Sequence, residues 1–397
     1  RVECEDRRAR AAVFGPLLPL CGPDRGDGRP AYPRDLPARL WRALKLKTPR
    51  GVEAAVIISQ RLAPPDGGGS AIYDSLCREA AAGLRDRSED FAAIAEALDA
   101  TGPGAAGAFA GLLDVAPVAR ATLQRLPEWM NHMNEDAAAA ARLAFKDATQ
   151  VAEDAGLRLM EILFAHMEEP SRILRLICAV MDRPGESYVA ASEMSCFGDR
   201  VLADIEARIA EVTALDPDAG LDAGARAGRA ASVAVAQFIE FERGVELAPK
   251  GPWGQRISRQ KRALAAAVES RLKQAQLAAA QALPMKAKAR GSVRGLPDVS
   301  ADPEPRLVQR GLALLAFLDE IRGAAAACGF GRPRAETVEV LSAQLDQYVE
   351  DLLDLIHSGD PALAPRARAH LAIAAEFLGL VTDPKAAEVA RRRAAAA

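Results

Sequence analysis

The chain has 397 residues, of which half are apolar and 26% are charged, with a net charge of −3 and an isoelectric point near 6.0. Its length supports two or three domains of roughly 150 residues each, so a sizeable core is available. The weakly acidic balance argues against a surface that is basic throughout and binds nucleic acid, and no apolar run reaches the roughly 18 residues of a membrane span.

The amino-acid composition favours an all-α fold. Alanine is very abundant, aromatic residues make up only 5% of the chain, and no segment has the alternating pattern of a strand. Alanine is the best helix former because its side chain loses no conformational entropy in a helix. We therefore expect an all-α, multi-helix bundle with two helical subdomains joined by a long basic helix. The bias toward Ala, Arg, Gly and Pro indicates a bacterial source.

The first part of the chain divides into a short arm and an acidic helical domain. Residues 1–34 are expected to form a charged first helix followed by an irregular arm, because residues 15–34 are rich in proline and glycine. Residues 35–248 are expected to form an acidic N-terminal helical domain. Within it, Thr48 and Pro49 mark a helix start, since an N-cap residue precedes a proline in the first turn.

The strongest helical pattern runs from about Asn134 to Met167. Apolar residues recur there at helical spacing, and near the end of the pattern they cover more than half of the circumference. We expect one central helix of about 30 residues, roughly 45 Å long at 1.5 Å per residue. A helical enzyme or small-ligand carrier would have its pocket beside this helix, lined by residues such as Met160, His166 and Met167.

A glycine-rich segment, residues 216–230, precedes the next helical pattern. Gly220, Gly224 and Gly228 recur there at every fourth position. In a membrane this spacing would indicate close helix packing, but the apolar run is too short for that reading. We expect a flexible helix start instead.

The sequence APKGPWG interrupts the helical pattern at residues 248–254 and marks a candidate domain boundary. Residues 249–304 are then expected to form a connector made of a basic helix and loop. Residues 305–397 have four further helical patterns and are expected to form a C-terminal helical bundle.

No motif in the sequence assembles a catalytic or metal-binding site. Gly102–Gly107 has the spacing of a dinucleotide-binding loop, but a helical pattern precedes it where the loop needs a strand, so we expect a turn between helices. Glu128 and His132 can share one helix face, yet a metal site between facing helices needs a second such pair. The sequence therefore predicts no catalytic residue, no metal and no cofactor, and enzyme activity is uncertain and less favoured.

The six cysteines are widely spaced, and no two have C-x-x-C spacing. This pattern argues against a disulfide framework and against a zinc site made of thiolates. It favours a reducing compartment, so we expect a cytoplasmic protein.

The clearest charge feature is the segment 249–297, with eleven Lys and Arg residues and one acidic residue, Glu269, for a net charge of +10. A stripe of apolar residues at helical spacing predicts that this helix packs against the rest of the protein. The stripe consists of Ile257, Leu264, Val268, Leu272, Ala275, Ala279 and Leu283. Lys261 falls within the stripe, so its ammonium group has to reach outward along its own aliphatic chain. The predicted partner-binding residues are Arg256, Arg259, Arg262, Lys273, Lys286, Lys288, Arg290 and Arg294.

The sequence favours a non-catalytic scaffold or protein–protein interaction protein, in which the basic helix and loop dock an acidic partner surface through complementary charge. Nucleic acid or anionic lipid is an alternative ligand for the same segment. Only Trp253 is available there for base stacking, and the alanine-rich stripe lacks large membrane anchors. A helical enzyme or ligand carrier is a third reading. The basic segment is also compatible with a solvated linker, and self-association is left open.

Overall fold

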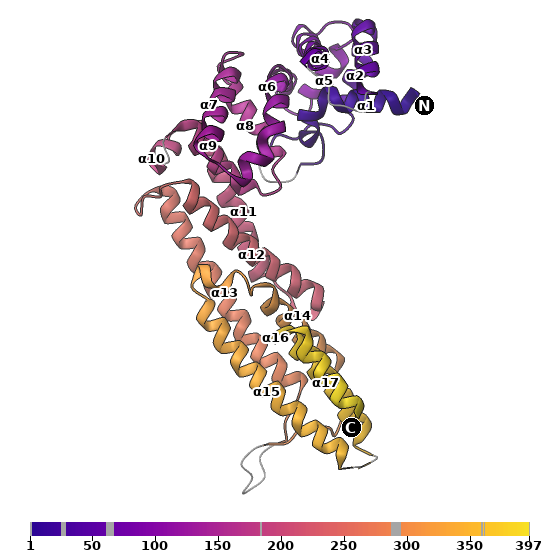
Figure 1. The fold of residues 1–397 in the computed structure, drawn as a ribbon, viewed down its shortest axis with the longest axis vertical. Helices are drawn as coiled ribbons and strands as arrows, with labels where there is room; N and C mark the ends of the chain where they lie inside the picture. Colours follow the sequence, from indigo (N-terminus) through magenta and orange to yellow (C-terminus); the bar gives the residue numbers. More distant parts are fainter. Residues whose placement is uncertain are drawn as a thin grey trace. The chain divides into compact units, whose positions relative to one another are not determined.

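The computed structural model describes residues 2–24, 29–60, 67–182, 185–286, 295–358, 360 and 362–396. These residues form α-helices α1 to α17 and four short 3₁₀ helices, and they contain no strand (Figure 1). The all-α prediction is therefore confirmed. Only isolated bridges occur between extended residues, such as the one that joins Met285 and Pro297.

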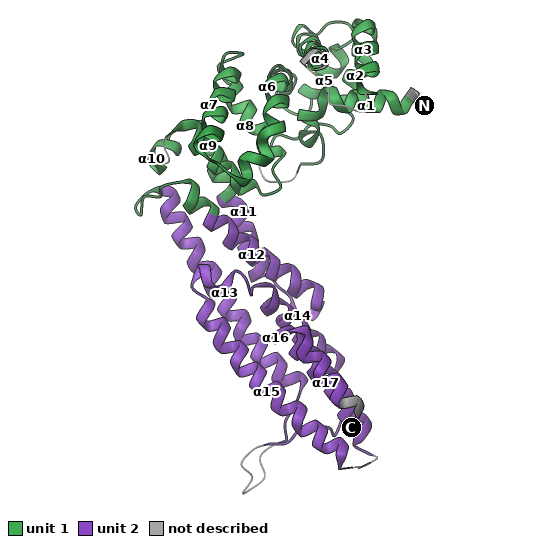
Figure 2. Ribbon diagram, in the orientation of Figure 1, with its two compact units in different colours: residues 1–201, 240–251 green, residues 202–239, 252–397 purple. Residues whose placement is uncertain are grey.

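The described chain divides into two compact units (Figure 2). Unit 1 contains residues 1–201 and 240–251, and unit 2 contains residues 202–239 and 252–397. One crossing point between them, Gly251 to Pro252, lies within the APKGPWG interruption. The basic helix belongs to unit 2. The expected domain ranges, 1–34, 35–248, 249–304 and 305–397, stay a prediction.

Unit 1 is built from short and medium helices. These are α1 (Val2–Phe14), α2 (Leu36–Lys47), α3 (Pro49–Ser59), α4 (Gly67–Asp86), α5 (Ala92–Asp99), α6 (Ala105–Asn131), α7 (Glu135–Thr149), α8 (Ala155–Ala165), α9 (Ile173–Met181), α10 (Glu186–Val189) and the first residues of α11 (Ser195–Thr213). The 3₁₀ helices η1 (Gly15–Leu20) and η2 (Pro170–Arg172) complete the unit. As expected, the glycines at 102–107 form the turn between α5 and α6, where Gly104 has φ +77°.

Helix α6 is the core of unit 1, because α4, α5, α7 and α8 all pack against it. Its Arg120 side chain donates to the Val13 carbonyl at the end of α1 at 2.7 Å and pairs with Asp74 of α4 at 3.3 Å. Among the described residues, α6 is the one helix with the length and composition of a membrane span, and 56% of its most apolar window is buried. Buried helices in the core of a protein can also have this length and composition.

The expected 30-residue central helix is wrong, because the chain breaks between α7 and α8. The two helices pack against each other, and α8 also packs on α6. Gly156 lies against the ring of Phe145, where an added Cβ would come within 2.5 Å of a ring carbon. The reversal buries the wide apolar face of α8 against α6, whereas Leu143 of α7 is left 58% exposed. Periodicity could not reveal the break, since no proline or glycine lies between the two helices.

Unit 2 is built from longer helices. These are the rest of α11, most of α12 (Leu221–Gly244), α13 (Pro252–Ala282), α14 (Pro305–Glu320), α15 (Gly331–His357), α16 (Ala364–Val381) and α17 (Pro384–Ala396). Short 3₁₀ helices lie at η3 (Pro217–Ala219) and η4 (Ala325–Cys328). Helix α13 packs against α14 and α15, and α16 packs against α14, α15 and α17.

The expectation of a flexible start for α12 is also wrong. Helix α12 begins at Leu221, and its glycines Gly224 and Gly228 form the surface that meets α14. A Cβ on Gly224 would stand 1.7 Å from the Ala313 carbonyl oxygen, and one on Gly228 would stand 2.6 Å from Glu320 Cβ. The glycines therefore serve close helix packing, which a soluble bundle can use as well as a membrane protein.

We predict that Gly224→Ala destabilises the protein by about 1–3 kcal/mol, because the added methyl group has to push two helix backbones apart. Gly107→Ala is the matched control: Gly107 lies in α6, and a Cβ added there would meet no neighbouring atom within 4 Å. That substitution should be neutral or stabilise by up to about 1 kcal/mol, as expected for Gly to Ala in a helix. Urea unfolding followed by circular dichroism measures both. Equal effects of the two substitutions would contradict the close contact.

Candidate functional site

Helix α13 carries the predicted partner-binding segment, and its buried stripe is as predicted. All seven stripe residues are at most 5% exposed, and Leu264 and Val268 are fully buried. Gln260 lies beside the stripe and donates through Nε2 to the Leu202 carbonyl at 2.8 Å, so its amide nitrogen has a partner on the buried side. The stripe fixes the rotation of α13 about its axis and thereby decides which cations face outward.

Three of the six cations of α13 are used inside unit 2. Arg256 pairs with Glu206 of α11 at 3.2 Å. Lys261 lies over the ring of Phe238 of α12, with its ammonium nitrogen 5.7 Å from the centroid, as expected for a lysine that reaches out of the stripe. Arg271 donates to the carbonyls of Val212 and Thr213 and so satisfies the C-terminal end of α11.

The other three cations, Arg259, Arg262 and Lys273, face solvent and have no ion-pair partner among the described residues. We call these three residues the α13 basic face.

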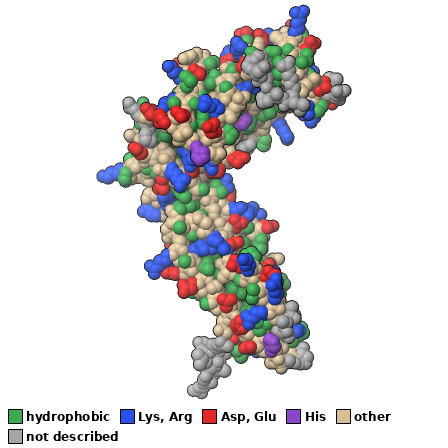
Figure 3. Space-filling model, viewed as in Figure 1, with side chains coloured by type: hydrophobic (Ala, Val, Ile, Leu, Met, Phe, Trp, Pro, Cys, Tyr) green, Lys and Arg blue, Asp and Glu red, His purple; other side chains and the backbone are tan. Residues whose placement is uncertain are grey.

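Of the predicted loop cations, Lys286 is exposed. Lys288, Arg290 and Arg294 lie outside the described residues. On the side of unit 2 seen in Figure 3, basic, acidic and apolar side chains are interspersed.

Unit 2 has an apolar groove where the last turns of α13 lie beside α15. We call it the α13–α15 groove; its volume is about 630 Å³. Its lining consists of Ala279, Ala280, Leu283, Met285, Leu341, Ala343, Gln344, Leu345, Gln347 and Tyr348. Among the described residues, no charged side chain belongs to this lining, so they offer an apolar floor with two amide groups at its edge.

Tyr348 connects the floor of the groove to a buried polar network. Its hydroxyl lies 3.3 Å from His370 Nδ1 of α16 and 3.4 Å from the Pro284 carbonyl. The opposite ring nitrogen of His370 contacts the Ala301 carbonyl at 3.1 Å. Burial, together with the nearby Asp298 carboxylate, raises the pKa of Tyr348, so the phenol stays neutral and holds the end of α13 against α15 and α16.

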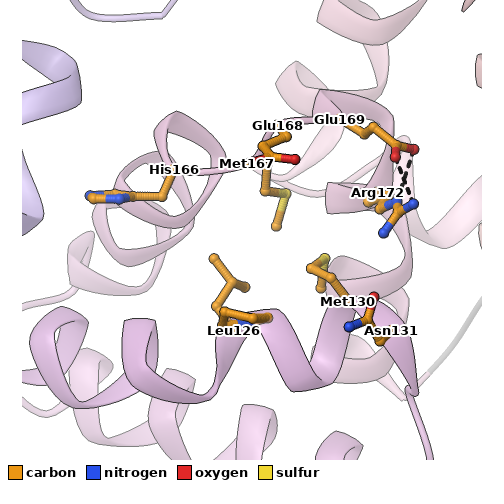
Figure 4. Close-up of a pocket in the computed structure, with 9 residues that line it drawn as sticks. Leu126, Met130, Asn131, His166, Met167, Glu168, Glu169 and Arg172 are labelled. Carbon is orange, nitrogen blue, oxygen red and sulfur yellow. Dashed lines mark hydrogen bonds and ion pairs between the residues drawn. The ribbon is translucent and has the colours of Figure 1, made fainter.

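Unit 1 has a smaller hollow of about 310 Å³ between the end of α6 and the segment after α8. Leu126, Met130 and Met167 point toward one another across it, while the His166 ring points away (Figure 4). His166 Nε2 contacts the Pro16 carbonyl at 2.9 Å, so this nitrogen carries a proton and donates. Met160, which was expected to line such a pocket, is instead buried at 1% exposure.

Two charged groups at the edge of this hollow pair with each other. Arg172 donates to both carboxylate oxygens of Glu169, at 2.9 and 2.6 Å. The described lining contains no Ser, Thr, Cys or Lys side chain that a neighbouring base could activate as a nucleophile. Among the described residues, no group of three or more His, Cys, Asp and Glu side chains is placed to hold a metal ion.

Comparison with protein-family models, curated proteins and solved structures finds no match to this chain.

Sequence reasoning found the α13 basic face but missed the groove beside it. Leu341, Leu345 and Tyr348 recur at helical spacing on α15, which indicated only that this helix has a buried side. Nothing in the spacing shows that these buried residues form the floor of a groove beside the end of α13. His370 had no polar neighbour in the sequence, whereas the fold places Tyr348 and the Ala301 carbonyl on its two ring nitrogens.

We predict different roles for two arginines of α13. Arg271→Ala should destabilise the protein by about 1–3 kcal/mol, since it leaves the C-terminal carbonyls of α11 without their charged donor. Arg262→Ala, the control on the same helix, should change the free energy of unfolding by less than about 0.5 kcal/mol. Chemical denaturation measures both. A large effect of Arg262→Ala on the free energy of unfolding would contradict our description of Arg262 as an exposed cation without an ion-pair partner among the described residues.

We predict that Cys4 reacts first with iodoacetamide. All six cysteines are free thiols, and Cys4 is exposed. Burial raises the pKa of Cys21 and Cys77 to about 12 and that of Cys178 to about 11, so their reactive thiolate is scarce at pH 8. Peptide mass spectrometry of the folded protein should show Cys4 labelled well before these three, and unfolding in urea should remove the difference. Equal early labelling of Cys77 would contradict its burial.

Proposed function

We propose that this protein is a non-catalytic, cytoplasmic scaffold that docks an acidic surface of a partner protein through α13. The observation that carries the proposal is that Arg259, Arg262 and Lys273 are exposed and have no ion-pair partner among the described residues, while the neighbouring cations of the helix are paired within unit 2. Cations that remain unpaired on a rigid helix are available for an acidic partner and steer its approach.

The position of α13 supports this proposal. Its buried stripe is anchored against α14 and α15, so the basic face is presented by a fixed element and not by a loop. In this proposal the chain has two helical subdomains. The docking helix follows directly after the chain passes from unit 1 into unit 2 at Gly251.

The alternatives have weaker support. Nucleic acid needs a broad basic surface or stacking platforms, but Trp253 of α13 is 3% exposed and cannot stack on a base. Anionic lipid remains a second ligand for the basic face. A small-ligand carrier would use the hollow beside Met167, whose 310 Å³ is at the lower end of the roughly 300–1,000 Å³ of ligand pockets.

We predict that the triple variant Arg259→Glu, Arg262→Glu, Lys273→Glu loses its protein partners. The tagged full-length chain is immobilised, incubated with bacterial lysate with and without nuclease, and the captured proteins are identified by mass spectrometry. Acidic proteins should be captured at low salt irrespective of nuclease, and the capture should weaken as salt screens the contact. The charge-reversed variant should not capture them.

The matched control reverses three exposed arginines of unit 1, with Arg7→Glu, Arg8→Glu and Arg50→Glu. It changes the net charge by the same amount and should retain the partners. Capture that disappears with nuclease would favour nucleic acid. Cosedimentation with phosphatidylglycerol vesicles that depends on the α13 basic face would favour lipid. Partners that bind both triple variants equally would rule out the proposed docking surface.

A further inference from the structure

The α13–α15 groove is an apolar surface that the described residues leave open. Its floor is formed by buried side chains such as Leu283, Leu341 and Leu345, each at most 4% exposed, whereas Met285 at its edge is 48% exposed. Val340 lies one turn before Gln344 on the groove side of α15 and is 43% exposed. Contact between water and the exposed apolar side chains at the edge, Met285 and Val340, raises the free energy, so an apolar occupant that covers them would be stabilised there.

The groove and the α13 basic face are continuous. At 100° per residue, Arg262, Lys273 and Ala280 point in the same direction within about 20°. Ala280 lines the groove, and the two cations precede it along the same side of the helix. Glu269, the single acidic residue of α13, also lies on this side, between the two cations.

Two lysines flank the groove on its α13 side. Lys273 lies about two turns before the lining residue Ala280, and Lys286 directly follows the lining residue Met285. Lys286 is near the Asp298 carboxylate, whose pKa is lowered first by hydrogen bonds from Ser300 and then by Lys286 and His370. The groove side of α15 carries mainly amides and apolar groups. Three acidic side chains of α15 lie more than about 100° around the helix from Gln344, namely Glu339, Asp346 and Glu350, and two lie about 80° from it, namely Glu336 and Asp354. Asp351 lies about 20° from Gln344, but it is 3% exposed and accepts a hydrogen bond from the lining residue Gln347 at 2.9 Å.

We propose that the α13–α15 groove binds an amphipathic acidic helix of a partner protein. Apolar side chains of that helix enter the groove, and its acidic side chains face Lys273, Lys286 and Arg262. This inference rests on the proposed function, since it specifies the acidic surface that α13 docks. A helix fits better than a strand because α13 and α15 have no free backbone edge, so an occupant has to satisfy its own backbone hydrogen bonds.

The test uses three fluorescein-labelled peptides of about 21 residues, roughly six helical turns. The acidic peptide has leucine on one helical face and glutamate and alanine elsewhere. The basic peptide replaces the glutamates with lysine, and the scrambled peptide keeps the acidic composition without the leucine face. Fluorescence anisotropy with the full chain should show that the acidic peptide binds at least about tenfold more tightly than the other two.

Two measurements locate the bound peptide. Methyl NMR should show a shift at Met285, whereas Met130 and Met167 in unit 1 should not move. Ala343→Arg should weaken binding about tenfold or more, because it fills the groove, even though its charge attracts the peptide. Ala335→Arg is the matched control: it is an exposed alanine of α15 on the side opposite Gln344, and it should bind like the unmodified chain.

The outcomes separate this inference from the proposed function. If reversing Arg259, Arg262 and Lys273 abolishes binding of the acidic peptide but Ala343→Arg does not, the basic face docks partners and the groove proposal is overturned. Equal binding of the acidic and scrambled peptides overturns it as well, while lysate capture still decides the proposed function. A dimer in light scattering that Ala343→Arg converts to a monomer would make the groove a self-interface and would also overturn it.

Discussion

The packing of the α13 stripe against α14 and α15 is the constraint on which the surface of unit 2 depends. A helix of this length has one free rotation about its axis, and burial of Leu264, Val268 and Leu272 removes it. Once the rotation is fixed, each cation has a determined environment. Arg271 reaches the end of α11, Lys261 covers Phe238, and Arg262 faces solvent.

Small residues explain how an alanine-rich chain with few aromatic side chains forms a close-packed core. Gly224 and Gly228 bring the backbone of α12 against α14, and Gly156 brings α8 against Phe145. Short distances between helices increase dispersion contacts along the whole interface, which compensates for the small size of each side chain. The largest fully buried rings, among them Phe109, Phe238 and Phe377, then fill the space that alanine leaves.

The buried polar groups of unit 2 hold the end of α13 in place. Tyr348 lies between the Pro284 carbonyl and His370, and His370 contacts the Ala301 carbonyl. This network joins α15, α16 and the chain that follows α13, so the floor of the groove is supported from behind. The docking proposal is derived from the α13 basic face, and the groove proposal adds the supported apolar floor that lies on the same side of that helix.

The sequence by itself determined the helical fold, the buried stripe of α13 and the existence of an excess of positive charge. Each follows from local rules, since alanine content, apolar spacing and charge act within one helix. Only the tertiary structure decided that α7 and α8 form separate helices, that Gly224 and Gly228 pack against α14, and that an apolar groove lies beside α13. It also decided that half of the α13 cations are paired. These features depend on which helices become neighbours, because a contact between residues distant in sequence leaves no periodic signal in either segment.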